Sequence, residues 1–217
     1  MTTFESDESR GPSVTEQLLS MLTDGTIGAG ERIREADIAR RCGVSRTPVR
    51  DSIRELAGAG VLVLEPNRGA RVRSYSIREI EQIYRSRALV ESHLAALAVP
   101  EMTEQDVAHL KELAAEMREL GDDPARRTEL SQLNNRFHRY YISRVEGHPL
   151  ISTAEQLMVP LLVSKVMVTY DPRLTAISMD HHDELVTAAE QGDPEWAASL
   201  MRTHILSGWN RYRSVVE

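Results

Sequence analysis

The chain has 217 residues, of which 41% are hydrophobic, so it can form two modest cores and we expect two domains. Cys42 is the only cysteine, which excludes a disulfide within the chain and removes any need for an oxidising compartment. Since no apolar run of about 18 residues occurs, we expect neither a signal peptide nor a spanning helix, and a cytoplasmic location. The polar residues 1–12 are expected to be flexible.

The net charge of -7 is distributed unevenly along the chain. From Arg32 to Arg73 there are ten arginines and five acidic residues, while the only two lysines, Lys111 and Lys165, lie elsewhere. Arginine is suited to paired contacts with phosphate or guanine. A solvated surface is the alternative explanation for such a segment.

Residues 13–74 have the pattern of a winged helix-turn-helix. Apolar residues at helical spacing predict a helix over residues 13–23, and a second short helix is predicted over residues 35–42. Gly43 allows a sharp turn, and Ser45 is placed to cap a third helix. The apolar side of that third helix leaves four polar side chains near its solvent side: Arg46, Thr47, Arg50 and Arg54.

The third helix is followed by the run VLVLEP, then NRGA and RVRS, which predict a two-stranded hairpin with an arginine at its tip. This hairpin would be the wing. Helix-turn-helix shapes also occur in proteins that never bind DNA. The wing, the local positive charge and the exposed Arg and Thr side chains together favour DNA binding.

From residue 75 onward the pattern changes to long amphipathic helices, and the fold class expected is mainly α. Proline and glycine mark the breaks between six helices, which would form an antiparallel bundle. No common enzyme motif is present in this segment. The predicted helices cover residues 76–98, 103–120, 126–144, 149–168, 175–191 and 194–214.

Several polar side chains share the buried faces of these helices. Asn134 and His138 lie one turn apart, and His182 and His204 lie on or beside apolar stripes of two further helices. Three imidazoles and one amide oxygen could enclose a divalent metal such as zinc or nickel. The alternative is that each is an ordinary core histidine, and periodicity alone does not choose between His181 and His182.

The segment GVSRTPVRDSIRELAGAGVLVLEPNRGARV resembles the DNA-binding signature of GntR-type regulators. The resemblance implies that bases or phosphates are contacted by the exposed residues of the third helix and that the wing contacts the minor-groove side. Some members have arginine at the position of Ala36, so that contact is absent here or made by Arg34. The expected DNA-binding residues are Arg34, Ser45, Arg46, Thr47, Arg50, Arg54, Asn67, Arg68 and Gly69.

Residues 75–217 are similar to the FCD ligand-binding domain of the FadR subgroup, through N-x3-H, H-x2-L and MxxHI. The resemblance implies metal ligation by Asn134, His138, His182 and His204, and many members have Asp in place of Asn134. It also places Arg87 toward the effector cavity, where a metal and the guanidinium could clamp a small carboxylate. An exposed ion pair between Arg87 and Glu91 is the alternative.

We therefore expect a DNA-binding regulator, working as a homodimer on a palindromic operator and controlled by a small organic acid. Two other hypotheses remain. A metal-dependent enzyme could use Glu184 as a base. A structural DNA-binding protein would instead have an apolar filling around Asn134.

Overall fold

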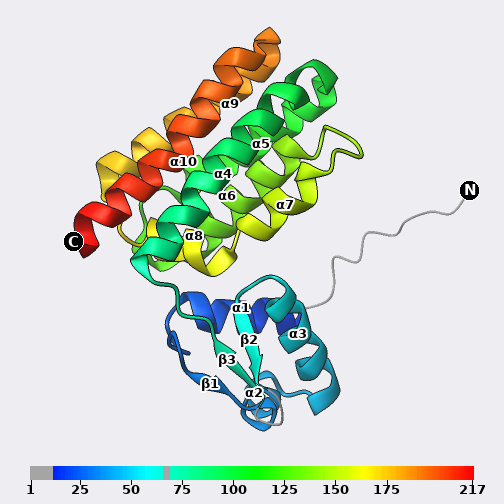
Figure 1. The fold of residues 1–217 in the computed structure, drawn as a ribbon, viewed down its shortest axis with the longest axis vertical. Helices are drawn as coiled ribbons and strands as arrows, with labels where there is room; N and C mark the ends of the chain where they lie inside the picture. Colours follow the sequence, from blue (N-terminus) through cyan, green and yellow to red (C-terminus); the bar gives the residue numbers. More distant parts are fainter. Residues whose placement is uncertain (1–11, 66–68) are drawn as a thin grey trace, which may run out of the picture. The chain divides into compact units, whose positions relative to one another are not determined.

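The computed structural model describes residues 12–65 and 69–217, and it divides into two compact units between Ser74 and Tyr75. The described residues are mainly helical, with one small antiparallel sheet in the first unit (Figure 1). The predicted fold class is thereby confirmed. Except for Pro12, the segment predicted to be flexible lies outside the described residues.

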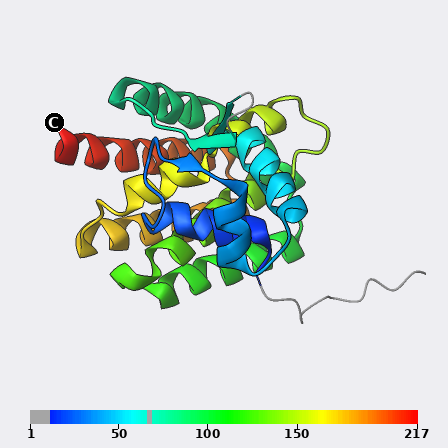
Figure 2. The same cartoon turned by 90° about the horizontal axis from the view of Figure 1, so that it is seen from below.

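Three helices form most of the first unit, and Figure 2 shows them from below in blue to cyan. A capping box begins the first helix, because the Ser13 hydroxyl accepts from the Glu16 amide and the Glu16 carboxylate accepts from the Ser13 amide. The turn after the second helix uses Gly43 at φ 68°, a backbone angle that glycine adopts without strain. The helices are α1 (Val14–Thr23), α2 (Glu35–Cys42) and α3 (Arg46–Gly58).

The sheet of the first unit has three strands, not the two predicted. β2 (Leu62–Glu65) and β3 (Gly69–Val72) form the expected hairpin, and β1 (Arg32–Ile33) pairs with the other edge of β3. β1 is two residues long and buries only Ile33, so it has no alternating pattern to detect.

Seven α-helices form the second unit within the described residues, not six. They are α4 (Ile77–Ala98), α5 (Glu104–Leu120), α6 (Arg127–Ile142), α7 (Leu150–Leu157), α8 (Pro160–Met167), α9 (Pro172–Gln191) and α10 (Pro194–Val216). Two short 3-10 helices, Val99–Glu101 and Pro124–Arg126, lie in the connections.

The predicted helix 149–168 is wrong as a single element, because it divides into α7 and α8. Pro160 lacks an amide hydrogen and its ring clashes with the preceding turn, so it is placed at the first position of α8. Among the described helices no single one is long and apolar enough to cross a membrane. α7 and α8 reach that length and composition only together, across a bend of 50°.

The helix predicted from residue 175 begins earlier, at Pro172. Asp171 caps it by accepting from the Leu174 amide at 2.9 Å, and the proline occupies the first turn. Along the bundle α4 packs on α10, α10 on α9, and α5 on both α6 and α9. This packing directs the inner faces of α4, α6, α9 and α10 toward a common interior.

Candidate metal centre and nucleic-acid interface

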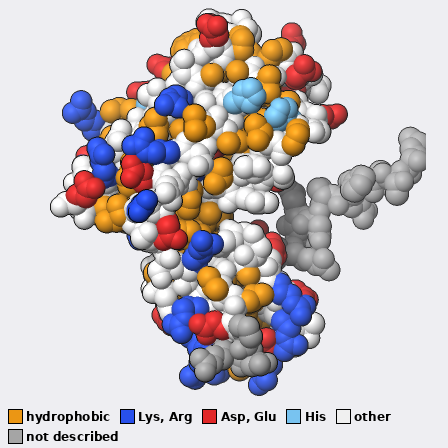
Figure 3. Space-filling view, in the orientation of Figure 1, with side chains coloured by type: hydrophobic (Ala, Val, Ile, Leu, Met, Phe, Trp, Pro, Cys, Tyr) orange, Lys and Arg blue, Asp and Glu red, His pale blue; other side chains and the backbone are white. Residues whose placement is uncertain are grey.

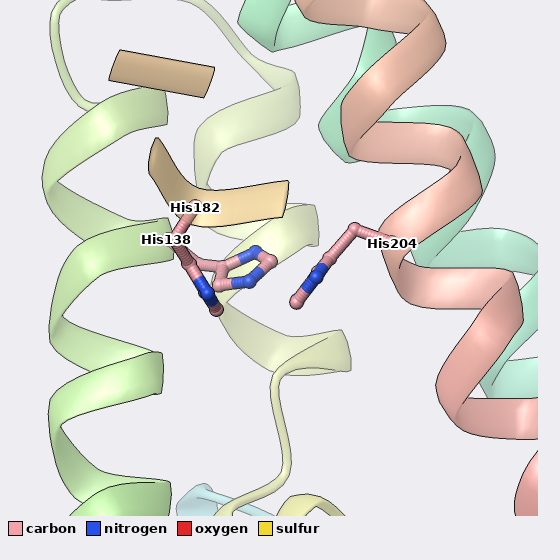
Figure 4. A group of neighbouring side chains, drawn as sticks. All are labelled: His138, His182 and His204. Carbon is pink, nitrogen blue, oxygen red and sulfur yellow. The ribbon is translucent and has the colours of Figure 1, made fainter. Parts of the chain in front are cut away.

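Three histidines from three helices meet inside the second unit: His138 on α6, His182 on α9 and His204 on α10 (Figure 4). Each offers one ring nitrogen, and these nitrogens lie within 4.8 Å of one another. The three residues are 0%, 0% and 7% exposed. We call them the imidazole cluster.

Hydrogen bonds fix the rings of two of these histidines. His138 Nδ1 lies 2.7 Å from Glu91 Oε2, and His182 Nδ1 lies 2.7 Å from the Ser178 carbonyl oxygen. With Nδ1 donating in this way, Nε2 of each ring has a free lone pair, as in metal-ligating histidines. Within the described part of the chain, both Nε2 atoms are buried and have no hydrogen-bond partner.

Burial also determines the charge of two rings of the cluster, those of His182 and His204. Desolvation, followed by the charge of neighbouring imidazoles, lowers the pKa of His182 to about 3 and that of His204 well below its usual value. Both rings are therefore neutral at pH 7, which is the form that binds metal. The orphaned Nε2 atoms and the neutral rings fit a soft or borderline divalent ion.

A small cavity of about 20 Å³ lies beside the cluster and is lined by Arg87, Asn134 and His204. Its remaining wall is mainly apolar and aromatic: Tyr84, Val163, Val166, Met167, Tyr170, Ile205 and Gly208. Gly208 makes room for Tyr170, because a Cβ there would lie 2.7 Å from the tyrosine hydroxyl. Arg87 and His204, which line this cavity together with Asn134, argue against the wholly apolar filling expected of a purely structural domain.

Arg87 and Glu91 form a buried ion pair, so the alternative of an exposed pair is wrong. Arg87 Nε lies 2.7 Å from Glu91 Oε1, and the two side chains are 3% and 0% exposed. Burial raises the pKa of Glu91, but Arg87 and His138 outweigh it and the net pKa is lowered. The ionised carboxylate therefore joins the guanidinium to the imidazole cluster.

The other histidines lie outside the cluster. His93 is exposed, while His109 and His148 are half-buried. His181 is also half-buried, with its ring 5.8 Å from that of His204, and its Nδ1 has no hydrogen-bond partner among the described residues.

In the first unit, the described residues expected to contact DNA are all exposed: Arg34, Ser45, Arg46, Thr47, Arg50, Arg54 and Gly69. Figure 3 shows arginine side chains on this unit, with acidic ones between them. Asn67 and Arg68 lie outside the described residues. Ser45 is the N-cap residue of α3, but its side chain makes no capping hydrogen bond.

The arginines of α3 differ in their partners. Arg50 is bound by Glu35 through two hydrogen bonds, and Arg54 lies 3.7 Å from Asp51. Arg46 makes no hydrogen bond or ion pair with the described residues. Arg50 is therefore fixed on the surface of α3, whereas Arg46 and Arg54 are not.

Comparison with known families agrees with both units. Residues 12–72 match the bacterial regulatory proteins of the gntR family, and residues 82–207 match the FCD domain, which alone covers more than half of the chain. The chain belongs to the GntR family. This GntR protein is a transcriptional regulator with a helix-turn-helix DNA-binding domain and an FCD ligand-binding domain.

Relatives of this GntR regulator include the uncharacterized HTH-type transcriptional regulator YdhC of Bacillus subtilis, 27% identical over 76% of this chain and 74% of its own. The probable D-xylose utilization operon transcriptional repressor of Paenarthrobacter nicotinovorans is 27% identical over 88% of this chain and 84% of its own. The solved structure of E. coli McbR/YncC has a TM-score of 0.74 at 22% identity, covering 95% of this chain and 100% of its own, which shows the shared fold.

Membership of the GntR family answers the enzyme hypothesis, since the family and these relatives are regulators and not enzymes. Glu184, considered as a base, is exposed on α9.

Sequence reasoning missed the role of Glu91, which it treated only as a surface partner. A signal was present: Glu91 follows Tyr84 by seven residues and precedes Ala98 by seven, on the buried stripe of α4. A charged residue on such a stripe is rarely buried without a partner.

Proposed function

We propose that this GntR regulator binds a near-palindromic operator as a homodimer, and that a small carboxylate effector in the FCD domain changes its operator affinity. The observation that carries the proposal is the imidazole cluster, with two orphaned Nε2 atoms, beside a cavity lined by a buried arginine. A two-fold protein reads two-fold DNA, so a palindromic operator follows from the proposed dimer. Access to chromosomal DNA implies a cytoplasmic location.

The proposed ligands are Asn134, His138, His182 and His204. Imidazole nitrogens with an amide oxygen suit zinc or nickel, and the hydrogen bonds that two of the rings donate to Glu91 and to the Ser178 carbonyl hold those rings in the required tautomer. When bound, the ion supplies positive charge and a coordination position for an anion. Because Asn134 is neutral, the site has one negative charge fewer than in members with Asp there.

Arg87 is the proposed effector-binding residue. Its guanidinium lines the cavity and can pair with a carboxylate held there. The cavity of about 20 Å³ admits little more than a water molecule, so even a small acid must displace part of the wall formed by α8.

Regulation requires only that the effector prefer one arrangement of the dimer over another. A coupling free energy of about 1–3 kcal/mol would change operator affinity by about 5- to 150-fold. Operator affinity that stays constant at saturating concentrations of every acid that binds would contradict the proposal.

The first test is metal content, measured by mass spectrometry on protein purified without chelator. We expect near-stoichiometric metal in the parent and a clear loss in His138→Ala. His93→Ala is the matched control, because His93 is exposed and outside the cluster. Equal metal content in parent and His138→Ala would refute the ligand set, and no metal in any sample would refute the ion.

A further inference from the structure

Glu35 and Arg50 form a bidentate ion pair across the helix-turn-helix. Glu35 is the first residue of α2, and Arg50 lies one turn into α3. Arg50 Nε donates to Glu35 Oε1 at 2.9 Å, and Arg50 Nη2 donates to Glu35 Oε2 at 2.8 Å. Two parallel hydrogen bonds fix the plane of the guanidinium as well as its position.

The pair differs from the other contacts on the same helix face. Arg46, Arg50 and Arg54 recur every four residues, so they line one side of α3. Arg54 has only a 3.7 Å contact with Asp51 in its own helix, and Arg46 has no ion pair with the described residues. Among the residues that the structure describes, the central arginine of the three is the one fixed from outside α3.

The negative charge of Glu35 weakens binding to the phosphates of DNA. The hydrogen bond from Arg50 is the main cause that lowers the pKa of Glu35, so the carboxylate is ionised at neutral pH. Its side chain is 29% exposed, and a carboxylate at a DNA-binding surface repels phosphates. Neutral-pH affinity for phosphate would therefore be higher without it.

Glu35 leaves some N–H donors of Arg50 free to bind DNA while it holds the guanidinium in place. Arginine has five N–H donors, and Glu35 occupies the side formed by Nε and Nη2. The end of the guanidinium has one N–H on each of its two terminal nitrogens. These two donors are not used by Glu35, and they form a fork directed away from it. Such a fork matches N7 and O6 of guanine in the major groove.

We propose that Glu35 is a positioning residue for base recognition: it holds the Arg50 guanidinium so that its terminal fork reads one guanine in each operator half-site. This inference rests on the proposed operator binding. Glu35 thereby lowers affinity for DNA in general and raises discrimination at one base pair.

The test is a binding selection from DNA duplexes with a randomised central segment, which requires no known operator. We expect the wild-type protein to enrich a two-fold site with a guanine at one fixed position of each half. In Glu35→Gln the preference at that position should fall by about tenfold or more, while the other positions keep theirs. Arg50→Lys, which keeps the charge and loses the fork, should lose the same preference.

The matched control is Asp37→Asn. Asp37 is also in the first turn of α2 and pairs with an arginine, Arg40, at 2.7 Å, but neither residue is among the expected DNA contacts. Its selected site should equal that of the wild type. Thermal unfolding of Glu35→Gln should match that of Asp37→Asn, because both pairs are exposed.

Two results would overturn the inference. If Glu35→Gln selects the wild-type site unchanged, Glu35 does not orient Arg50. If it binds every duplex more tightly with the same relative preferences, the carboxylate acts only by repulsion. A wild-type protein that enriches no sequence would instead refute the proposed operator binding itself.

Discussion

Replacing Glu91 by glutamine would remove the negative charge that joins Arg87 to the imidazole cluster. Glu91 is 0% and Arg87 3% exposed, so the variant leaves a buried guanidinium without its carboxylate. Breaking a buried pair in this way costs about 3–5 kcal/mol. Since 1 kcal/mol shifts the Tm of a protein of this size by about 2–4 °C, the Tm of the chelator-treated variant should fall by about 6–20 °C.

The same substitution should weaken metal binding, because His138 Nδ1 loses its carboxylate acceptor at 2.7 Å. Loss of such an outer partner lowers metal affinity by about 10- to 100-fold, which competition with a chelating dye would measure. Arg87→Met combined with Glu91→Leu should recover much of the stability while leaving metal affinity low, which separates the two effects.

The control for Glu91→Gln is Glu81→Gln on the same helix. Glu81 also pairs with an arginine four residues later, but the side chains of Arg85 and Glu81 are 60% and 34% exposed. Such a pair contributes about 0.3–0.5 kcal/mol. Equal Tm values for the Glu91 and Glu81 variants would refute the reasoning that the buried pair holds the FCD core together.

Three further predictions concern stability. Treatment with a chelator should lower the Tm of the parent but not of His138→Ala, because metal at 100 times its Kd stabilises the fold by about 2.7 kcal/mol. Hydrogen bonds from Thr103 and Tyr140, with Arg144 also donating, hold the pKa of Asp106 below its ordinary value. The stabilisation by ionised Asp106 is fully present above about pH 3.9, the pKa of an unfolded aspartate, and is lost as the pH falls toward the lower folded-state pKa. The urea midpoints of the parent and Asp106→Asn should therefore converge as the pH is lowered below about 3.9. Asp193→Ala should cost about 1 kcal/mol in urea unfolding, because Asp193 caps α10 through the Trp196 amide at 3.0 Å; an unchanged midpoint would show that the cap contributes nothing.

Local chemistry explains why the helix-turn-helix could be predicted from the sequence. Gly43 and the apolar spacing of Val49 and Ile53 specify the turn and the buried side of α3 without help from distant residues. The mainly helical class of the second unit follows from periodicity in the same way. The candidate metal ligands lie on three helices, and the family pattern, not periodicity, singled out His182 from His181.

Features that depend on distant partners could not be predicted. β1 exists because β3 offers a free edge to Arg32 and Ile33, which no local pattern indicates. Pro160 itself was a clear local signal for the helix break. The apolar periodicity of residues 149–168 nevertheless led to the prediction of one continuous helix. Arg87 and Glu91 face the core because α6 and α10 pack over α4. The spacing of residues along α4 alone does not predict this packing.

The order of the imidazole cluster along the chain has a consequence for biosynthesis. His138 and His182 are made before His204, which lies on the final helix of the described fold. On the proposed ligation, the ion is therefore acquired after synthesis of the domain is almost complete and cannot act as an early template for its folding. Proteolytic removal of α10 would take away His204, and with it one of the three imidazoles of the cluster, without cutting the first unit.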